Sequence, residues 1–184
     1  VNIVWEWHLW DHLIQDVDPE LPNYGVVSDH PELQDINYGN AGSNGGPGGA
    51  NGDWKHFNAV AYNEDLDQIA LSSRFHDEIY IIDHSTTTEE AAGHTGGNSG
   101  MGGDFLYRWG NPHSYNRGSD LDRVLDDQHS VNWIPEGYPG EGNLILFNNN
   151  YGSNSAVFEI VTPINEDGTY SISPGQPYGP VSYT

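Results

Sequence analysis

The sequence predicts an all-β fold made of short strands joined by turns. Runs of β-branched and aromatic residues, about five or six residues long, recur along the chain and are bounded by Gly, Pro, Asn or Asp. The only helix-like segments are too short to organise a fold. With 184 residues, the chain is long enough for one ordinary domain with a sizeable core.

The expected strands follow one another along most of the chain. They are residues 2–7, 57–62, 68–73, 78–83, 104–109, 130–134, 143–147, 156–161 and 169–173. Short helical segments are expected at 10–15 and 120–127. Two glycine-rich stretches, 38–53 and 93–104, are predicted to lie outside the sheets, either as connecting or mobile loops or as loops that line a site.

A weak internal repeat groups these strands into larger units. "HFNAVAY", "DQIALSSR" and "EIYIID" align with "HSVNWIP", "GNLILFNNN" and "AVFEIV", which sets His56 against His129, 73 residues later. A candidate outer strand ending in tryptophan, "VWEW" or "LYRW", precedes each unit. A four-stranded unit whose first strand opens on histidine is the sequence form of a β-propeller blade. A sandwich with accidental similarity is the alternative.

The repeat also divides the chain. We expect the outer strand of a preceding blade in residues 1–12, a glycine-rich loop at 38–53, one blade at 54–112 and the next at 128–175. The chain would therefore hold about two blades plus an outer strand of a single propeller domain.

Composition narrows the range of partners. Five basic residues against 27 acidic ones give a formal net charge of −22, which repels nucleic acid and anionic membranes, so neither is predicted as a partner. The acidity indicates a solubilising surface, a salty environment or bound divalent cations. No cysteine is present, which excludes disulfides and thiol chemistry. No transmembrane-length apolar run or secretory leader is seen, and because the chain begins with Val1 we expect a processed or partial chain.

Five motifs carry a family resemblance. "DWKHFNAVAYN", "SSRFHDEIYIIDH", "GDFLYRWGNP", "QHSVNWIP" and "GNLILFNNN" occur in this order, and together they resemble the arylsulfotransferase family of six-bladed β-propellers over residues 2–161. The resemblance implies transfer of a sulfuryl group from a phenolic sulfate ester to another phenol, through a sulfated histidine and independently of the nucleotide donor PAPS. We expect no cofactor, no metal site, and an extracellular or periplasmic location.

The resemblance also assigns roles to individual residues. His56 and Asn58 of "HFN" match the family's sulfate-binding histidine and asparagine, and Arg74 of "SSR" matches its sulfate-clamping arginine. His129 of "QH" matches the transiently sulfated nucleophile, and His12 of "DH" is the nearest candidate for a further active-site histidine.

The chemistry of these residue types supports the same roles independently. Sulfuryl transfer resembles phosphoryl transfer, in which catalysis consists largely of positioning and electrostatic stabilisation. A guanidinium clamps two equatorial oxygens and an amide donates to the third. A histidine that is mostly neutral near pH 7 offers a nucleophilic nitrogen. An acceptor phenol needs a base, for which His56 or His12 is available.

Other interpretations of these residues remain open. A lone histidine at a strand start, or Asn58, is more often a satisfied turn or core residue. "WEWHLW" is most simply core packing, although Trp7 there is also a candidate for facing an aromatic substrate. Arg108 is expected to pair with a carboxylate. Asp126 and Asp127 either orient the ring of His129 or are solvated loop charges.

Two hypotheses about the whole molecule follow. Six blades need more chain than 184 residues, so we expect a fragment of a longer polypeptide, or several copies that complete the arrangement as a homo-oligomer. The competing functional hypothesis is a catalytically inactive, extracellular, propeller-like binding or structural protein that assembles through open blade edges.

Overall fold

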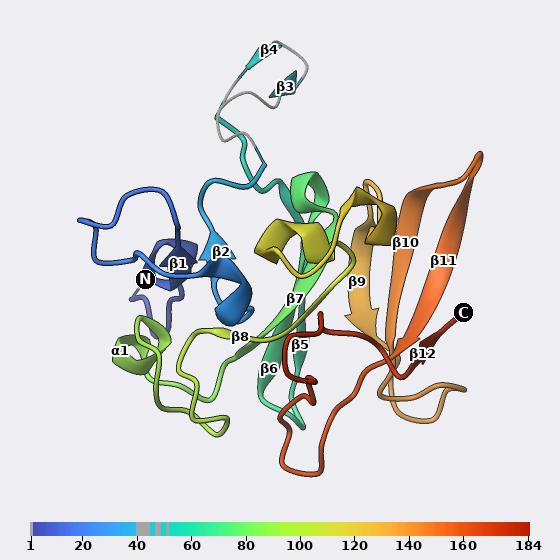
Figure 1. Cartoon of the computed structure of the whole chain (residues 1–184). Helices are drawn as coiled ribbons and strands as arrows, with labels where there is room; N and C mark the ends of the chain where they lie inside the picture. Colours follow the sequence, from blue (N-terminus) through green and yellow to red (C-terminus); the bar gives the residue numbers. More distant parts are fainter. Residues whose placement is uncertain (1, 40–44, 47–48, 51) are drawn as a thin grey trace.

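The computed structural model describes residues 2–39, 45–46, 49–50 and 52–184 (Figure 1). Two four-stranded antiparallel sheets carry the fold, and the one α-helix of the described chain is the single turn α1, Thr88–Ala91. The predicted all-β class is therefore confirmed. No helix of the described residues is long and apolar enough to cross a bilayer.

The first sheet is an antiparallel meander in chain order. Its strands are β5 (Phe57–Asn63), β6 (Gln68–Ser73), β7 (Glu78–Asp83) and β8 (Phe105–Trp109). Strands β6 and β7 have the predicted bounds, because each is a compact run of β-branched or apolar residues between turn residues. Every residue of β7 and β8 is buried, so these two strands are covered on both faces.

The second sheet repeats the same order. It contains β9 (His129–Trp133), β10 (Leu144–Tyr151), β11 (Asn154–Val161) and β12 (Ser182–Tyr183). A shared core joins the two sheets: Ile79 and Ile81 of β7 belong to one cluster with Val131, Leu144 and Ile160. The first strands, β5 and β9, lie against each other, as the inner strands of neighbouring blades would. The number of blades in the complete arrangement remains a prediction.

Two predicted strands do not form. Residues 2–8 have no strand pairing; Trp5 and Trp7 instead pack on the outer apolar cluster of the first sheet. Residues 169–173 make only an isolated bridge, because Tyr170 turns into the core and its hydroxyl donates to Gln68 Oε1 at 2.9 Å. The fourth strand of the second sheet is β12, so this unit extends past the predicted end at residue 175.

The remaining elements are short. They are the 3₁₀ turns η1 (Leu9–His12), η2 (Val27–Asp29), η3 (Arg74–His76), η4 (Pro112–Tyr115) and η5 (Asp120–Asp122), the parallel pair β1 (Leu13–Ile14) and β2 (Gln34–Asp35), and the antiparallel pair β3 (Gly45–Gly46) and β4 (Gly49–Ala50). The predicted helical segments thus appear only as η1 and η5.

The described residues of the two glycine-rich stretches lie outside the two large sheets. In residues 93–104 the chain folds back on itself: Asp83 Oδ2 accepts hydrogen bonds from the Ser99 amide at 2.9 Å and its hydroxyl at 2.6 Å, and the Gly102 amide donates to the Gly96 carbonyl. Of the stretch 38–53, residues 40–44, 47–48 and 51 lie outside the described residues.

Candidate active site

Four of the predicted site residues gather where β5 begins, β6 ends and β9 begins. Phe57 pairs with Ser73 in the ladder, so His56 comes opposite Arg74, whose amide donates to the His56 carbonyl at 3.2 Å. Asn58 is the second residue of β5, and His129 opens β9 beside it. Antiparallel pairing within one sheet and contact between two sheets therefore bring together residues up to 73 positions apart.

Arg74 is held from one side by a carboxylate. Its Nε and Nη2 donate to the two oxygens of Asp127 at 2.9 and 2.7 Å, and this contact raises the pKa of Arg74 above its ordinary value. The two side chains are 34% and 30% exposed, so the pair is open to solvent. A guanidinium has five N–H groups, and none of the other three bonds a described residue. The edge formed by Nη1 and Nη2 is thus available to an anion.

His129 is oriented by a main-chain carbonyl. Its Nδ1 lies 2.9 Å from the Asp127 carbonyl oxygen, which also accepts from the Asn149 amide nitrogen at 2.7 Å. The Asn149 amide nitrogen, a donor, also lies 3.0 Å from Nδ1, so these contacts fit either neutral tautomer; the tautomer that donates from Nδ1 to the carbonyl has its lone pair on Nε2. Left-handed backbone at Asp127 (φ 55°) and Ser130 (φ 62°) flanks the histidine and sets this local geometry.

His56 is oriented in a parallel way, but by a charged group. Its Nδ1 lies 2.5 Å from Asp53 Oδ2, and its main-chain amide donates to the other oxygen at 3.0 Å. His56 itself has a φ of 47°, and its ring packs beside Phe75. Both histidines therefore have Nδ1 occupied, so that Nε2 is the atom left for chemistry.

Gln128 fastens the two sheets together immediately before His129. This side chain is fully buried, and its Nε2 donates to the carbonyls of Ser73 and Glu78 at 2.9 and 2.8 Å. The main-chain carbonyl of Gln128 accepts a hydrogen bond from Asn58 Nδ2 at 2.8 Å. Asn58 keeps a second N–H on the same nitrogen, since a side-chain amide has two.

A family model described as Arylsulfotransferase (ASST) matches residues 1–171, which is most of the chain and includes all the residues above. The chain belongs to the arylsulfotransferase family. A search of curated proteins gave no match. Membership implies a sulfotransferase and supports sulfuryl transfer at the level of the family, which confirms the resemblance carried by the five motifs.

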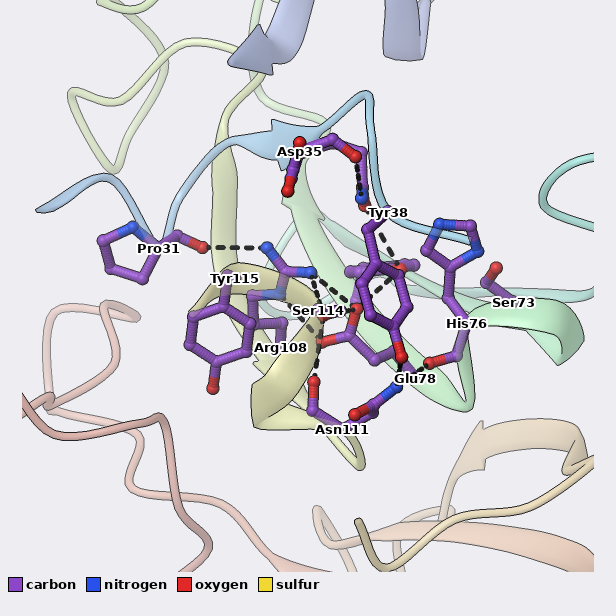
Figure 2. A network of polar contacts seen from close by, with 12 residues as sticks. Pro31, Asp35, Tyr38, Ser73, His76, Glu78, Arg108, Asn111, Ser114 and Tyr115 are labelled. Carbon is purple, nitrogen blue, oxygen red and sulfur yellow. Dashed lines mark hydrogen bonds and ion pairs between the residues drawn. The ribbon is translucent and has the colours of Figure 1, made fainter. Parts of the chain in front are cut away.

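A buried polar network includes Ser73 and His76, on either side of Arg74 and Phe75 in the chain (Figure 2). Arg108 and Glu78 form an ion pair, and neither side chain is exposed to solvent. The prediction that Arg108 pairs with a carboxylate is therefore confirmed. Asn111 Nδ2 donates to the His76 carbonyl at 2.9 Å and so fixes η3, the turn that begins with Arg74. The network thus holds the turn that carries Arg74.

Lys55, the residue before His56, belongs to the same network. Its Nζ donates to Gln34 Oε1 at 2.6 Å and to the Tyr80 hydroxyl at 2.8 Å, inside a fully buried environment. Burial lowers the pKa of Lys55 well below its usual range. Lys55 therefore anchors the start of β5 and does not supply a cation to the site.

The charges around the site are predominantly negative. Asp77 is the central carboxylate: it accepts from Arg123 Nη1 at 2.7 Å and from the Asp127 amide at 3.0 Å, and burial raises its pKa to about 6. The two arginines here are outnumbered by four carboxylates, those of Asp53, Asp77, Asp126 and Asp127. Binding of an anion at this place must therefore depend on directed N–H groups more than on net potential.

The structure does not bring His12 or Trp7 to these residues. His12 is fully buried between Asp104 and the Ala91 carbonyl, with contacts of 2.7 and 2.8 Å. Trp7 stacks on His12 with parallel rings, and its indole N–H donates to the Gly103 carbonyl at 2.7 Å. Trp7 packs on the outer apolar cluster of the first sheet, so the pair lies apart from the residues at the start of β5 and β9.

Sequence reasoning missed several supporting residues. Asp53, Gln128 and Asn149 were not assigned a role, although each lies inside or next to a quoted motif, "DWKHFN", "QH" or "FNNN". Asp127 was expected to act on His129 through its carboxylate, whereas the contact comes from its carbonyl and the carboxylate holds Arg74. The left-handed φ of Asp127, which directs these groups apart, has no clear sequence signal.

Proposed function

We propose that the chain transfers a sulfuryl group from an aryl sulfate ester to a phenol through a covalent intermediate on His129. One observation carries the proposal: Asp127 contacts both reacting groups. Its carbonyl accepts from Nδ1 of His129 in the tautomer whose lone pair is on Nε2, and its carboxylate fixes the plane of Arg74. A nucleophile and an anion clamp held by one residue suit an in-line displacement at sulfur.

The sulfate ester is bound by directed donors. The exposed edge of Arg74 offers two parallel N–H groups to two sulfate oxygens, and the second amide N–H of Asn58 is available to the third. These donors are worth most as charge spreads over the equatorial oxygens in the loose transition state.

The first half-reaction forms the intermediate. Nε2 of His129 attacks sulfur, the S–O bond to the aryl group breaks, and the phenolate leaves with the bonding electron pair. His56 gives a proton from Nε2 to that oxygen. Asp53, in contact with Nδ1, stabilises the positive ring of His56 before this transfer, as a carboxylate does in a catalytic triad.

The second half-reaction returns the site to its first state. The acceptor phenol gives its proton to Nε2 of His56 and attacks sulfur, and the S–N bond to His129 breaks. The new aryl sulfate leaves, and both histidines regain their starting protonation. His56 is preferred to His12 as the base, because both ring nitrogens of His12 are engaged inside the core. No nucleotide donor takes part in this scheme.

The test is detection of the intermediate. The chain is incubated with a nitrophenyl sulfate without acceptor, digested, and analysed by peptide mass spectrometry under alkaline conditions. We expect a sulfated His129 that disappears when a phenol is added, together with ping-pong kinetics. The His129→Asn variant should give no adduct, whereas His113→Asn, a change at a partly exposed histidine paired with Asp120, should behave as the wild type.

The other outcomes are equally informative. An adduct on His56 would exchange the roles of the two histidines. Turnover without any adduct would replace the covalent route by direct transfer. A folded chain with neither adduct nor turnover would favour the inactive binding or structural protein.

A further inference from the structure

A second cluster of polar side chains lies at the start of β8, the strand at the opposite edge of the first sheet from β5. His12, His94 and Asp104 each present one ligand atom, and these atoms all lie within 4.8 Å of one another. They come from two segments: η1 supplies His12, and the glycine-rich loop 93–104 supplies His94 near its start and Asp104 at its end, just before β8. His12 and Asp104 are buried, whereas the His94 side chain is 59% exposed.

The contacts of His12 decide which of its nitrogens carries a lone pair. Nε2 lies 2.8 Å from the Ala91 carbonyl, which only accepts, so a proton belongs on Nε2. The neutral ring then presents the lone pair of Nδ1 to Asp104 Oδ1 at 2.7 Å. Two lone pairs at that distance repel each other unless a positive ion is shared between them.

His94 places a second nitrogen at the same oxygen. Its Nδ1 is 2.8 Å from Asp104 Oδ1, so two imidazoles converge on one carboxylate oxygen. A carboxylate oxygen accepts two hydrogen bonds, so neutral His94 satisfies its contact by donating from Nδ1, whereas His12, with its proton on Nε2, needs either a second proton or a metal ion at Nδ1. A divalent cation bound by both nitrogens and the carboxylate satisfies all three groups without that second proton. The Ala91 carbonyl then acts as the outer hydrogen-bond acceptor that a metal-bound histidine commonly has.

We propose that His12, His94 and Asp104 form a site for a divalent transition metal of the Zn²⁺ class. Two imidazoles and a carboxylate suit Zn²⁺ better than Ca²⁺, which prefers oxygen ligands alone. Tetrahedral Zn²⁺ with bonds of about 2.0–2.1 Å sets its donors about 3.3 Å apart, so the three atoms must separate by about half an ångström. Exposed His94 has room for its share of this movement, whereas separation of the buried His12–Asp104 pair requires the Asp104 carboxylate to turn.

The surroundings provide both rigidity and access. Trp7 stacks on the His12 ring at 5.6 Å, and a side chain at Gly103 would come within 2.6 Å of His12 Nε2, so the ring is closely fitted. On the open side, His94 lines a cavity of about 580 Å³ together with His30, Trp10 and Asp11. Water from this cavity supplies the fourth ligand. The bound metal joins the N-terminal segment to the loop and to β8.

The test is titration of the chelator-treated chain with Zn²⁺ alone, followed by calorimetry in a buffer that does not bind metals. We expect one site per chain, and a loss of affinity of at least about 100-fold in His94→Ala, a change at an exposed ligand that spares the core. His113→Ala is the matched control, because His113 is 43% exposed and also contacts a carboxylate, Asp120, at 2.8 Å, but has no second histidine beside it.

Two further measurements make the result decisive. Saturating Zn²⁺ should raise the melting temperature of the wild type and of His113→Ala but not of His94→Ala, because a ligand that binds only the folded state stabilises it. Co²⁺ should give the visible absorption of a tetrahedral complex in the same two proteins. No Zn²⁺ binding by the wild type, equal affinity in His94→Ala, or an equal loss in His113→Ala would overturn the proposal.

Discussion

Two arginine–carboxylate pairs illustrate how the same contact serves different purposes in this molecule. Arg108 and Glu78 are completely buried, and all five N–H groups of Arg108 have acceptors: two on Glu78, the others on Ser114 and the carbonyls of Pro31 and Leu33. Arg74 gives only two of its five to Asp127 and is about one-third exposed. A saturated arginine holds a fold, whereas an unsaturated one is able to bind a ligand.

The free-energy balance of the two pairs differs as well. A buried ion pair is stable only because each charge compensates the other, so loss of one partner leaves an isolated charge in a poorly solvated place. An exposed pair contributes little to stability, because water solvates either charge alone. The comparison therefore predicts that Arg108 variants affect folding and Arg74 variants affect function.

The largest expected effect is on stability. Arg108→Met should lower the free energy of unfolding by about 3–5 kcal/mol, because Glu78 and Ser114 lose their buried partner. Arg74→Met should change it by less than about 1 kcal/mol. Urea unfolding of both variants measures the difference. Similar losses in the two variants would show that burial does not separate the pairs.

The next effect is on catalysis. Arg74→Lys keeps the charge but removes the parallel N–H groups, so kcat/KM for an aryl sulfate should fall by about 10²–10³-fold. Stability should stay near that of the wild type. Arg117→Lys, at an arginine that bonds only the carbonyls of Ser28 and Gln176, is the control and should keep its activity. Full activity in Arg74→Lys would remove the clamp from the proposed mechanism.

The sequence predicted the inner part of the fold better than its ends. Strands β6 and β7 were predicted with their exact bounds, because period and turn residues agree locally. Residues 2–7 and 169–173 have equally strand-like composition, but their aromatic side chains pack on the first sheet, and backbone pairing is absent in 2–7 and limited to one isolated bridge, at Tyr170, in 169–173. Which strand-like run finds a partner depends on tertiary contacts, to which local pattern is insensitive.

The site was predictable to a similar degree. The motifs brought out His56, Asn58, Arg74 and His129, which the structure gathers at one end of two sheets. They also suggested His12, which the structure places in a separate buried cluster. Sequence spacing does not reveal which face of a sheet a distant histidine reaches, nor that a carbonyl, and not a carboxylate, orients a ring.

The Asp77–Arg123 pair is intermediate between the buried Arg108–Glu78 pair and the exposed Arg74–Asp127 pair. The pH dependence of stability at Asp77 is therefore informative. Asp77 is nearly buried and pairs with Arg123, whose side chain is 38% exposed. Burial raises the pKa of Asp77 from 3.8 to about 6. The unfolded chain therefore releases this proton at lower pH than the folded chain does. Stability contributed by the protonated carboxyl is present below pH 4, is lost as pH rises to about 6, and stays lost above it.

The variant Asp77→Asn isolates this effect. An amide keeps the acceptor for the Asp127 amide and tolerates the left-handed backbone at this position (φ 53°). Relative to the wild type, the variant should gain up to about 3 kcal/mol in free energy of unfolding between pH 4 and pH 7. Asp120→Asn, at an exposed carboxylate, is the control. If the difference in free energy of unfolding between Asp77→Asn and the wild type does not change with pH, the raised pKa of Asp77 is contradicted.

The smallest expected effect is on kcat/KM, and it tests the exposed Arg74–Asp127 pair most directly. In Asp127→Asn the main-chain carbonyl that orients His129 remains, and asparagine accepts the left-handed φ of 55°. The side-chain amide accepts only one of the two Arg74 N–H groups, so the guanidinium plane loses its hold. We expect kcat/KM to fall by about 10–100-fold, with sulfation of His129 still detectable and stability within about 1 kcal/mol. Asp126→Asn is the matched control, because Asp126 contacts Asn150 and not Arg74. Equal losses of kcat/KM in Asp127→Asn and Asp126→Asn would show that only the negative charge matters. An unchanged kcat/KM in Asp127→Asn would show that Arg74 is positioned without a carboxylate.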